Sequence, residues 1–474
     1  MLPAPEICER ARLARDPRFD GRFLTGVVST GIYCRPICPA RPAGRDNVRY
    51  FPTAAAAEAQ GYRACRRCRP EVAPGVPEWA ISSDRVIRGL RLIDGGFLAD
   101  QSTAALAARL GVSTRHLNRL FHQELGATPS SLARSRRLHM ALRLIVETDL
   151  GFCDVALQAG YGSVRRFNAE VSGTFGRSPR ALRGVRDEEL TRELTLKLPV
   201  REPFDAPWMF RFLEQRALPG LEEVHGLEYR RRVGSGESWI TVSQRGGALN
   251  LKVPAGTSAS LSSILRRVRR LFDLQADSAV IDAHLARDPG LAPLVAASPG
   301  LRVPGAWDGF ETAVRAILGQ QVSVERARRL AETLIHRCGE GEFPKPRALA
   351  RFVPAAIGIP GKRWLAIAEL SRAVADGVID LDEGAARERL TDRLLALPGV
   401  GPWTAGYIGM RVAKDPDAFV DGDWAVLKAL QATPGAARRL AEPWRPWRAY
   451  AVMHLWSAPV PSVDAVRLQS VSGT

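Results

Sequence analysis

Hydrophobic and polar positions change period twice along the chain. From residue 84 to about 186, apolar residues recur at spacings of three and four, which predicts helices. Between 194 and 253 they alternate with polar residues, which predicts strands of a small antiparallel sheet at 194–198, 227–233, 239–242 and 249–253. After residue 258 the helical period returns and continues almost to the end. The pattern therefore predicts an all-helix region, followed by a region that begins with a sheet and ends in helices.

Glycine and proline residues divide the chain between these regions. The stretch at 72–77 carries two prolines and a glycine, so the first domain is expected to end near residue 75. A charged run at 186–189 separates the helical region from the predicted strands. With 474 residues, 46% of them hydrophobic, the chain can bury several cores and is expected to form at least three domains.

Charge adds a candidate partner to this picture, because the formal net charge is +17. Arginine outnumbers acid thirteen to seven in residues 1–71 and sixteen to eight in residues 83–186, whereas the rest of the chain is nearly balanced. A biased base composition explains arginine in place of lysine but not arginine in excess of acid, so double-stranded DNA is the expected partner. No apolar run approaches the roughly 20 residues of a bilayer span, so no membrane partner is expected.

Four of the seven cysteines lie in the first 68 residues, as Cys34-x3-Cys38 and Cys65-x2-Cys68. Two close pairs joined by one loop can bring four sulfur ligands to tetrahedral corners, which is the geometry of a zinc site. Disulfides are the alternative. The N-terminus does not read as a signal peptide and three further cysteines remain, which favours a cytosolic chain with metal-bound thiolates.

The residues around these cysteines point to a family. Residues 30–38 and 61–70, Thr-Gly-Ile-Tyr-Cys-Arg-Pro-Ile-Cys and Gly-Tyr-Arg-Ala-Cys-Arg-Arg-Cys-Arg-Pro, resemble the amino-terminal domain of the Ada alkylation-response family. The resemblance implies that Cys34 accepts a methyl group from a DNA methylphosphotriester, which would remove a negative charge and raise DNA affinity. It also implies zinc ligands and DNA contacts: Cys34, Cys38, Cys65 and Cys68 for the metal, Arg35 and Arg67 for DNA. A purely structural zinc is the alternative.

Residues 102–121 have the pattern of a helix-turn-helix. Small alanines let two helices cross closely, Gly111 makes the turn and Ser113 can cap the second helix. A second copy begins at residue 154, and a long helix over about 130–147 joins the two. The second helix of each unit carries the candidate base-reading residues, which are Arg115, His116, Asn118 and Arg119 in the first unit and Arg165, Arg166 and Asn168 in the second.

Two such units, closed by Gly176-Arg-Ser-Pro179, resemble the AraC-type DNA-binding domain. The resemblance implies that each recognition helix enters one of two successive major grooves, where arginine reads guanine and asparagine reads adenine. Following an Ada-like switch, this domain implies transcriptional activation of alkylation-repair genes, with promoter DNA and RNA polymerase as partners.

A glycine-rich turn at 397–405 leads into a helix. Gly399 and Gly401 allow backbone N–H groups to approach a DNA phosphate at a helix N-terminus. Together with Asp423, this turn resembles the helix-hairpin-helix DNA glycosylases, which implies that the Asp423 carboxylate stabilises an oxocarbenium-like sugar and orients water. Relatives that also cut the backbone carry a lysine where Trp403 stands, so a monofunctional enzyme is implied. No closing four-cysteine run follows, which excludes an iron–sulfur cluster.

Aromatic residues provide a candidate base pocket, made of Trp403, Tyr407, Trp424, Trp456 and the more distant Phe212. Alkylated purines carry a positive charge, so flat rings can bind them by stacking and cation–π attraction. Tryptophans of the hydrophobic core are the alternative reading of these residues. The chain contains Pro203-Phe-Asp205, Arg270-Leu-Phe-Asp-Leu-Gln275 and Arg315-Ala-Ile-Leu-Gly-Gln320, and on these stretches it resembles the AlkA-type 3-methyladenine glycosylases from about 194 to 456. The resemblance implies that a side chain near Gln320 and Gln321 fills the gap left by an everted base.

The sequence therefore predicts a multidomain protein with a small zinc-bound α+β domain (1–75), an all-α double helix-turn-helix domain (83–186) and an α+β glycosylase. In the glycosylase, a small antiparallel sheet (190–300) precedes a helix-hairpin-helix α-bundle (301–465). The predicted function is methyl acceptance, transcriptional activation and excision of 3-methyladenine and 7-methylguanine. A Pro-Cys-His-Arg motif for O6-methylguanine is absent from the sequence. The alternative is a transcriptional regulator with a non-catalytic glycosylase-like module. We expect a cytoplasmic, nucleoid-associated monomer.

Overall fold

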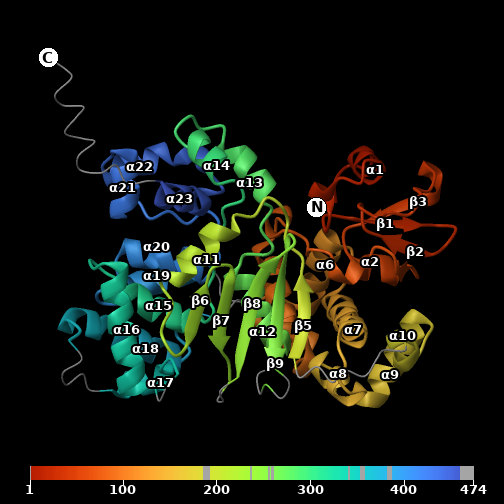
Figure 1. Ribbon diagram of the computed structural model, residues 1–474, viewed down its shortest axis with the longest axis horizontal. Helices are drawn as coiled ribbons and strands as arrows, with labels where there is room; N and C mark the ends of the chain where they lie inside the picture. The colour runs from red at the N-terminus through yellow and green to blue at the C-terminus, as the bar shows by residue number, and fades with distance from the viewer. Residues whose placement is uncertain are drawn as a thin grey trace.

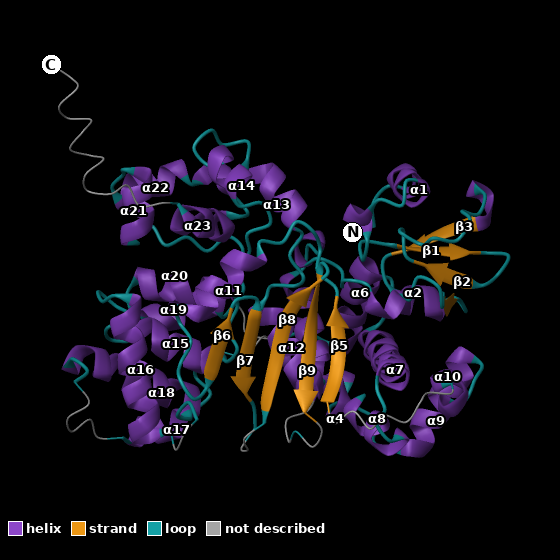
Figure 2. Ribbon diagram, in the orientation of Figure 1, coloured by secondary structure: helices purple, strands orange, loops and turns teal. Residues whose placement is uncertain are grey.

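The computed structural model describes residues 2–184, 193–234, 238–254, 257, 261–339, 342–352, 358–381 and 387–458 (Figure 1). A small N-terminal sheet lies at one end of the molecule, the C-terminal helices lie at the other, and a larger sheet stands between them. Both sheets are drawn in orange in Figure 2. The boundary expected between 186 and 190, and the end expected at 465, lie outside the described residues. No described helix has the length and hydropathy of a membrane span.

The N-terminal domain is a four-stranded sheet with the order β3-β1-β2-β4. Its strands are β1 (Leu24–Val27), β2 (Ile32–Cys34), β3 (Val48–Phe51) and β4 (Arg63–Ala64), and its helices are α1 (Pro5–Leu13) and α2 (Ala54–Ala59). Leu24, Tyr33, Phe51 and Tyr62 form its core with small alanines of α2. The predicted α+β domain is confirmed, with β2 ending at the first cysteine of the predicted zinc site.

The second region is helical throughout its described part, as predicted. Its helices are α3 (Asp84–Asp94), α4 (Phe97–Asp100), α5 (Thr103–Arg109), α6 (Thr114–Leu125), α7 (Pro129–Glu147), α8 (Phe152–Gln158), α9 (Val164–Phe175) and α10 (Pro179–Arg183). Gly111 has a φ of +70° in the turn between α5 and α6. The Ser113 side chain accepts a hydrogen bond from the His116 N–H at 3.3 Å, so Ser113 caps α6. The predicted long helix is α7.

The larger sheet is antiparallel, with five strands in the order β5-β9-β8-β7-β6. They are β5 (Glu193–Leu198), β6 (Glu222–His225), β7 (Glu228–Arg232), β8 (Trp239–Arg245) and β9 (Ala248–Pro254). The sequence pattern missed β6, because its inward position is Glu222, a carboxylate where an apolar residue is expected. Ion pairs hold this carboxylate in the interior.

Helices complete the C-terminal region, and the helical body predicted there is confirmed. They are α11 (Ala206–Glu214), α12 (Leu261–Leu271), α13 (Ser278–Leu285), α14 (Ala292–Ala297), α15 (Gly309–Leu318), α16 (Val324–Cys338), α17 (Pro346–Arg351), α18 (Gly361–Ala375), α19 (Arg387–Leu395), α20 (Pro402–Arg411), α21 (Trp424–Leu430), α22 (Pro434–Leu440) and α23 (Arg448–Ser457). Helix α12 packs its apolar side, including Ile264 and Val268, into one core with the sheet residues Val242 and Leu251.

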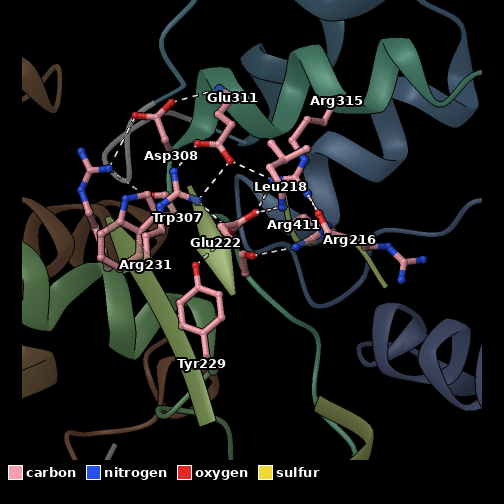
Figure 3. Close-up of polar contacts among 12 residues, drawn as sticks. Arg216, Leu218, Glu222, Tyr229, Arg231, Trp307, Asp308, Glu311, Arg315 and Arg411 are labelled. Atoms are coloured by element: carbon pink, nitrogen blue, oxygen red, sulfur yellow. Dashed lines mark hydrogen bonds and ion pairs between the residues drawn. The ribbon is translucent and has the colours of Figure 1, made fainter. Parts of the chain in front are cut away.

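A buried ionic network joins the edge of this sheet to α15 (Figure 3). Arg231 of β7 donates to Glu222 at 2.7 Å and to Glu311 at 2.6 Å. Arg315, one turn after Glu311 on α15, donates to both carboxylates, at 3.0 and 2.9 Å, and Tyr229 donates to Glu222 at 2.9 Å. Burial would raise the pKa of Glu222, but Arg315 and Arg231 outweigh it and lower that pKa to about 2. Paired charges therefore fix the sheet against the helices.

A second polar cluster joins the N-terminal domain to α7. The Tyr33 hydroxyl donates to Glu58 Oε1 at 2.8 Å, and His139 Nε2 lies 3.0 Å from both of these oxygens. Burial alone would lower the pKa of His139, but the Glu58 carboxylate outweighs burial and raises it. Two further contacts reach the ends of α6 and α9, where Thr53 donates to the Leu125 carbonyl and Arg66 to the Phe175 carbonyl. The N-terminal sheet is thus docked against both helix-turn-helix units.

Replacing Glu311 by glutamine is expected to lower the free energy of unfolding by about 3 kcal/mol, because it leaves the buried Arg231 and the partly buried Arg315 facing one carboxylate. Urea denaturation followed by tryptophan fluorescence measures the change. The matched control is Glu369→Gln, which breaks an exposed pair with Arg372 and is expected to cost less than about 1 kcal/mol. Equal losses in the two variants would contradict the role given to the buried network.

Candidate functional site

Asp423 is the N-cap residue of α21, and three N–H donors hold its carboxylate. Oδ1 accepts from the Val426 backbone N–H at 3.0 Å and from Trp456 Nε1 at 3.0 Å, while Oδ2 accepts from Trp403 Nε1 at 2.9 Å. Trp403 lies in the first turn of α20, and Trp456 lies near the end of α23. Helices distant in sequence therefore meet at one carboxylate, and their donors fix its orientation.

The predicted aromatic residues Trp403 and Trp456 contact this carboxylate, and Tyr407 packs against both of them. Tyr407 is one turn after Trp403 on α20, and their rings stack with centroids 5.4 Å apart and 21° between planes. Tyr407 and Trp456 have centroids 6.2 Å apart at 32°. All three side chains are partly buried and pack against the main core. We call these three residues and Asp423 the aromatic cluster.

Phe212 of α11 is linked to the aromatic cluster by Arg411, which contacts both Phe212 and Tyr407. It is buried and stacks on Trp208, and the guanidinium carbons of Arg216 and Arg411 lie 3.8 and 5.0 Å from its ring centroid. Arg411 also donates to the Tyr407 hydroxyl at 2.7 Å. Burial would raise the pKa of Tyr407, but Arg411 and Arg216 outweigh it and lower that pKa. Two cations therefore lie beside Tyr407, and one of them is hydrogen-bonded to its hydroxyl oxygen.

Sequence reasoning missed Arg411, although a usable signal was present. Arg411 is four residues after Tyr407 on α20, so helical spacing brings the two side chains to one face. Its Nε and Nη2 donate to the carbonyls of Pro304 and Gly305, at 2.8 and 2.9 Å. These long-range partners, which sequence spacing does not give, hold the guanidinium rigidly behind the tyrosine.

Trp424 lies apart from the cluster, although it follows Asp423 directly in the sequence. Its side chain is 69% exposed, and the Lys428 ammonium lies 4.9 Å from its ring centroid. As the first residue of α21, Trp424 turns away from the side on which Asp423 meets Trp403 and Trp456. The indole is thus on the surface, paired with a cation one turn along the helix.

The predicted hairpin joins α19 and α20 through an exposed turn. Gly399 has a φ of +80°, and a Cβ there would lie 3.0 Å from the Cβ of Ala366 on α18, so glycine is required. Gly401 is the N-cap residue of α20. Gln320 donates to the Gly399 carbonyl at 2.9 Å, which ties the hairpin to the end of α15. The next residue, Gln321, is exposed with a φ of +53°, an uncommon conformation for a residue with a Cβ.

The four predicted ligand cysteines come together in the N-terminal domain. Their sulfur atoms all lie within 4.8 Å of one another. Cys34 ends β2, and the Cys65 N–H donates to the Tyr33 carbonyl at 2.9 Å, which sets the two pairs side by side. A hydrogen bond from Cys34 is the largest cause that lowers the pKa of Cys68 to about 6. Four sulfur donors in one cluster fit a tetrahedral zinc ion, as predicted.

The arginines expected to contact DNA around this centre differ in exposure. The Arg35 guanidinium pairs with Asp20 and donates to the Cys68 carbonyl at 3.1 Å, and its side chain is only 14% exposed. Arg67 is exposed. Arg35 therefore braces the loop around the cysteines, whereas Arg67 faces solvent.

The predicted recognition residues lie on the surfaces of α6 and α9. In α6, Arg115 and Arg119 are exposed and His116 and Asn118 are partly exposed; in α9, Arg165, Arg166 and Asn168 are exposed. The opposite side of each helix is buried, with Leu117 and Phe121 in α6 and Phe167 and Val171 in α9. Each unit therefore presents one polar face to solvent.

These features define a class of protein. A four-cysteine metal centre, paired helix-turn-helix units and a hairpin beside an aromatic-bound aspartate are the parts of a DNA repair and regulatory protein. Three family descriptions match accordingly: the metal binding domain of Ada at residues 7–71, a helix-turn-helix domain at 106–184 and the AlkA N-terminal domain at 195–308.

Similarity over nearly the whole chain identifies the family. A Mycobacterium tuberculosis H37Rv protein named a probable bifunctional transcriptional activator/DNA repair enzyme AlkA is 41% identical over 475 residues, covering 95% of this chain and 96% of the relative. The chain therefore belongs to the family of bifunctional Ada/AlkA-type activator and DNA repair proteins. DNA-3-methyladenine glycosylase 2 of Escherichia coli is 35% identical, covering 54% of this chain and 94% of the relative. Escherichia coli Ada is 40% identical, covering 27% and 36%.

Replacing Cys68 by serine is expected to abolish stoichiometric zinc binding, because it removes one of four clustered sulfur donors. Metal analysis of the purified chain after gel filtration is expected to find one zinc per wild-type chain and little in the variant. The matched control Cys153→Ser changes an exposed cysteine on α8 and is expected to retain the metal. Equal zinc content in all three proteins would contradict the assignment.

Proposed function

We propose that the C-terminal region is a monofunctional DNA glycosylase that releases alkylated purines such as 3-methyladenine and 7-methylguanine. The observation that carries this proposal is the Asp423 carboxylate, held by two indole N–H groups within a set of stacked rings. A carboxylate suits a developing sugar cation, and flat rings suit a cationic base. Both functions meet in one small cluster.

Asp423 would act on the sugar rather than on the base. As the bond between C1′ and the base nitrogen breaks, its electrons neutralise the positively charged alkylated base, so no general acid is needed. The carboxylate stabilises the oxocarbenium-like sugar and accepts a proton as water adds to C1′. Three N–H donors occupy three of its roughly four acceptor positions, which leaves one for this role. Because Trp403 has no amine, no Schiff base forms and the DNA backbone stays intact.

The faces of the stacked rings support a preference for cationic bases, because an aromatic face attracts a cation. Arg411 and Arg216 contact Tyr407 and Phe212 from behind and hold their rings in place. We infer that Trp403, Tyr407, Trp456 and Phe212 form the walls that receive the base. Trp424, on the outside of α21, would instead contact DNA near the lesion.

The hairpin and the neighbouring turn would hold the DNA. The exposed backbone around Gly399 and Gly401 can donate N–H groups to phosphates without reading the bases. Gln321, exposed beside the hairpin-anchoring Gln320, is the proposed side chain that enters the stack after a base is everted. The positive φ of Gln321 supports this role, because strained turns often occur at functional sites.

For the N-terminal domain we propose methyl acceptance by Cys34. A zinc ion held by four thiolates would leave the sulfur atoms electron-rich. The Cys34 sulfur forms a bond to the methyl carbon of a methylphosphotriester, and the carbon–oxygen bond breaks with its electrons on the phosphate. The DNA regains its diester anion, and the protein loses one negative charge. Repulsion between the zinc centre and DNA therefore falls.

The docking of this domain supports a role in activating transcription. Contacts from Tyr33, Glu58, Thr53 and Arg66 hold the zinc centre at a constant position relative to α6 and α9. Stronger DNA binding by the methylated domain would therefore add to binding by the recognition helices, as in a bivalent ligand. Promoter DNA and RNA polymerase are the proposed partners of this state.

Asp423→Asn is expected to slow single-turnover release of 7-methylguanine from methylated duplex DNA at least roughly 100-fold, because an amide cannot stabilise the developing cation. Asparagine is a good N-cap, so the fold should remain. The matched control Asp421→Asn alters a neighbouring carboxylate that pairs with Arg438 and is expected to stay near the wild-type rate. Wild-type protein without excision would support the DNA-holding alternative, and unchanged release by Asp423→Asn would remove Asp423 from the mechanism.

Incubation with DNA carrying methylphosphotriesters is expected to add one methyl group to Cys34, detected by peptide mass spectrometry. Methylated protein should bind duplex DNA about fivefold more tightly at low salt, since one charge contact in water is worth about 1 kcal/mol. Cys153→Ser should accept the methyl group, and Cys34→Ser should not. Methyl-free Cys34 in the treated wild-type protein would leave the zinc with a purely structural role.

A further inference from the structure

A cavity of about 710 Å³ lies at the junction of the N-terminal sheet, the helix-turn-helix region and the C-terminal region. Its walls come from α2, α3, α4, α7 and α12, from the linker around Ile81, and from Trp447 and Tyr450. Neither the aromatic cluster nor the four clustered cysteines line it. The cavity is therefore separate from both proposed reaction sites.

Cationic side chains dominate the charged part of the wall. Lys414 and seven arginines of α3, α7 and α12 line the cavity, against five carboxylates; the arginines are Arg91, Arg136, Arg137, Arg143, Arg266, Arg269 and Arg270. Three of those carboxylates are already engaged by lining cations: Glu78 by Arg91, Asp94 by Arg136 and Asp273 by Lys414. The described wall therefore carries an excess of positive charge.

Among the lining arginines, Arg269 of α12 has the fewest partners. Its guanidinium has no hydrogen-bond or ion-pair partner among the residues that the structure describes. Burial, and next the charge of Arg143, lower the pKa of Arg269 to about 10; the Asp94 carboxylate acts in the opposite direction, and Arg136 lowers the pKa further. Arg136, Arg143 and Arg269 all line the cavity, together with Asp94, which pairs with Arg136.

Arg143 adds an unsatisfied donor. Its side chain is 2% exposed; Nη2 donates to Glu147 and to the Lys197 carbonyl, but Nε has no partner within the described part of the chain. A buried donor without an acceptor is costly, and an anionic group in the cavity would supply the acceptor that Arg143 Nε lacks.

We propose that this cavity binds a small phosphate-bearing molecule, with its phosphate among Arg136, Arg143 and Arg269. Guanidinium forks match phosphate oxygens in geometry and charge. Apolar side chains of Ile87, Leu98, Leu132 and Leu265 line the rest of the space and would cover an apolar or aromatic body. The volume lies in the range of small-molecule sites and is far too small for duplex DNA.

Such a ligand would act between domains. Arg136 and Arg143 belong to α7, which carries His139 and so contacts the zinc domain, whereas Arg269 belongs to the helix that packs on the larger sheet. A phosphate bridging these arginines would fasten the regulatory and glycosylase parts together. The inference depends on neither the glycosylase reaction nor methyl acceptance.

Isothermal titration of the full chain with AMP, a phosphomonoester with a flat body, tests the site. We expect one AMP per chain, with adenosine bound at least roughly tenfold more weakly, because it lacks the charged group. Arg269→Gln is expected to weaken AMP binding by a similar factor. The matched control Arg329→Gln, exposed on α16, should bind as the wild type does.

Two further measurements, thermal melting with AMP and competition by duplex DNA, test the proposal independently of the Arg269 variant. If Arg269→Gln does not fold, the melting temperature of the wild-type chain should still rise with AMP and not with adenosine. A duplex oligonucleotide should leave bound AMP in place, since displacement would assign the arginines to DNA backbone phosphate. The proposal is overturned if the wild type binds no AMP, if adenosine binds equally well, or if folded Arg269→Gln binds AMP with unchanged affinity.

Discussion

Two indole N–H groups on one carboxylate are the interaction on which the glycosylase half depends. Trp403 of α20 and Trp456 of α23 are more than fifty residues apart in the sequence, and each donates to a different oxygen of Asp423. The same bonds that orient the carboxylate also set the two indole planes, so the carboxylate and the walls of the proposed base site are fixed together. Tyr407 completes the set because it lies one helical turn after Trp403.

Support for this arrangement extends back to the sheet. The buried network of Glu222, Arg231, Glu311 and Arg315 joins β6 and β7 to α15, and Arg315 also donates to the Arg216 carbonyl (Figure 3). Arg216 in turn covers the ring of Phe212. Ion pairs, a hydrogen bond and a cation–π contact therefore connect the sheet to the far side of the aromatic cluster. Within the network each carboxylate faces an arginine, which offsets the cost of burying these charges.

Local signals in the sequence predicted much of the fold and part of the site. Cysteine spacing predicted the sulfur cluster, and Gly111 and Ser113 predicted the turn and the cap of α6. The features that the sequence did not predict depend on contacts between residues distant in the sequence. β6 was hidden because Glu222 is buried by partners from other elements, and no local pattern reveals that Arg35 turns inward to Asp20.

It was equally hard to predict which of two adjacent residues at one helix end would face solvent. Asp423 and Trp424 are adjacent, yet the first caps α21 toward the cluster and the second faces solvent. Only the packing of α20 and α23 decides which side is enclosed. The position of Arg269 likewise has no signature in the sequence, because the cavity that it lines forms where three parts of the chain meet.

The most direct test of the central claim is single-turnover release of 7-methylguanine by Trp403→Phe, Trp456→Phe and the double variant. Phenylalanine keeps a ring for stacking and removes only the N–H donor to Asp423. The account predicts a fall of at least roughly tenfold in each single variant, since a hydrogen bond to a charged group is worth about 1.5–3 kcal/mol, and a larger fall in the double variant. Wild-type rates in all three would contradict it.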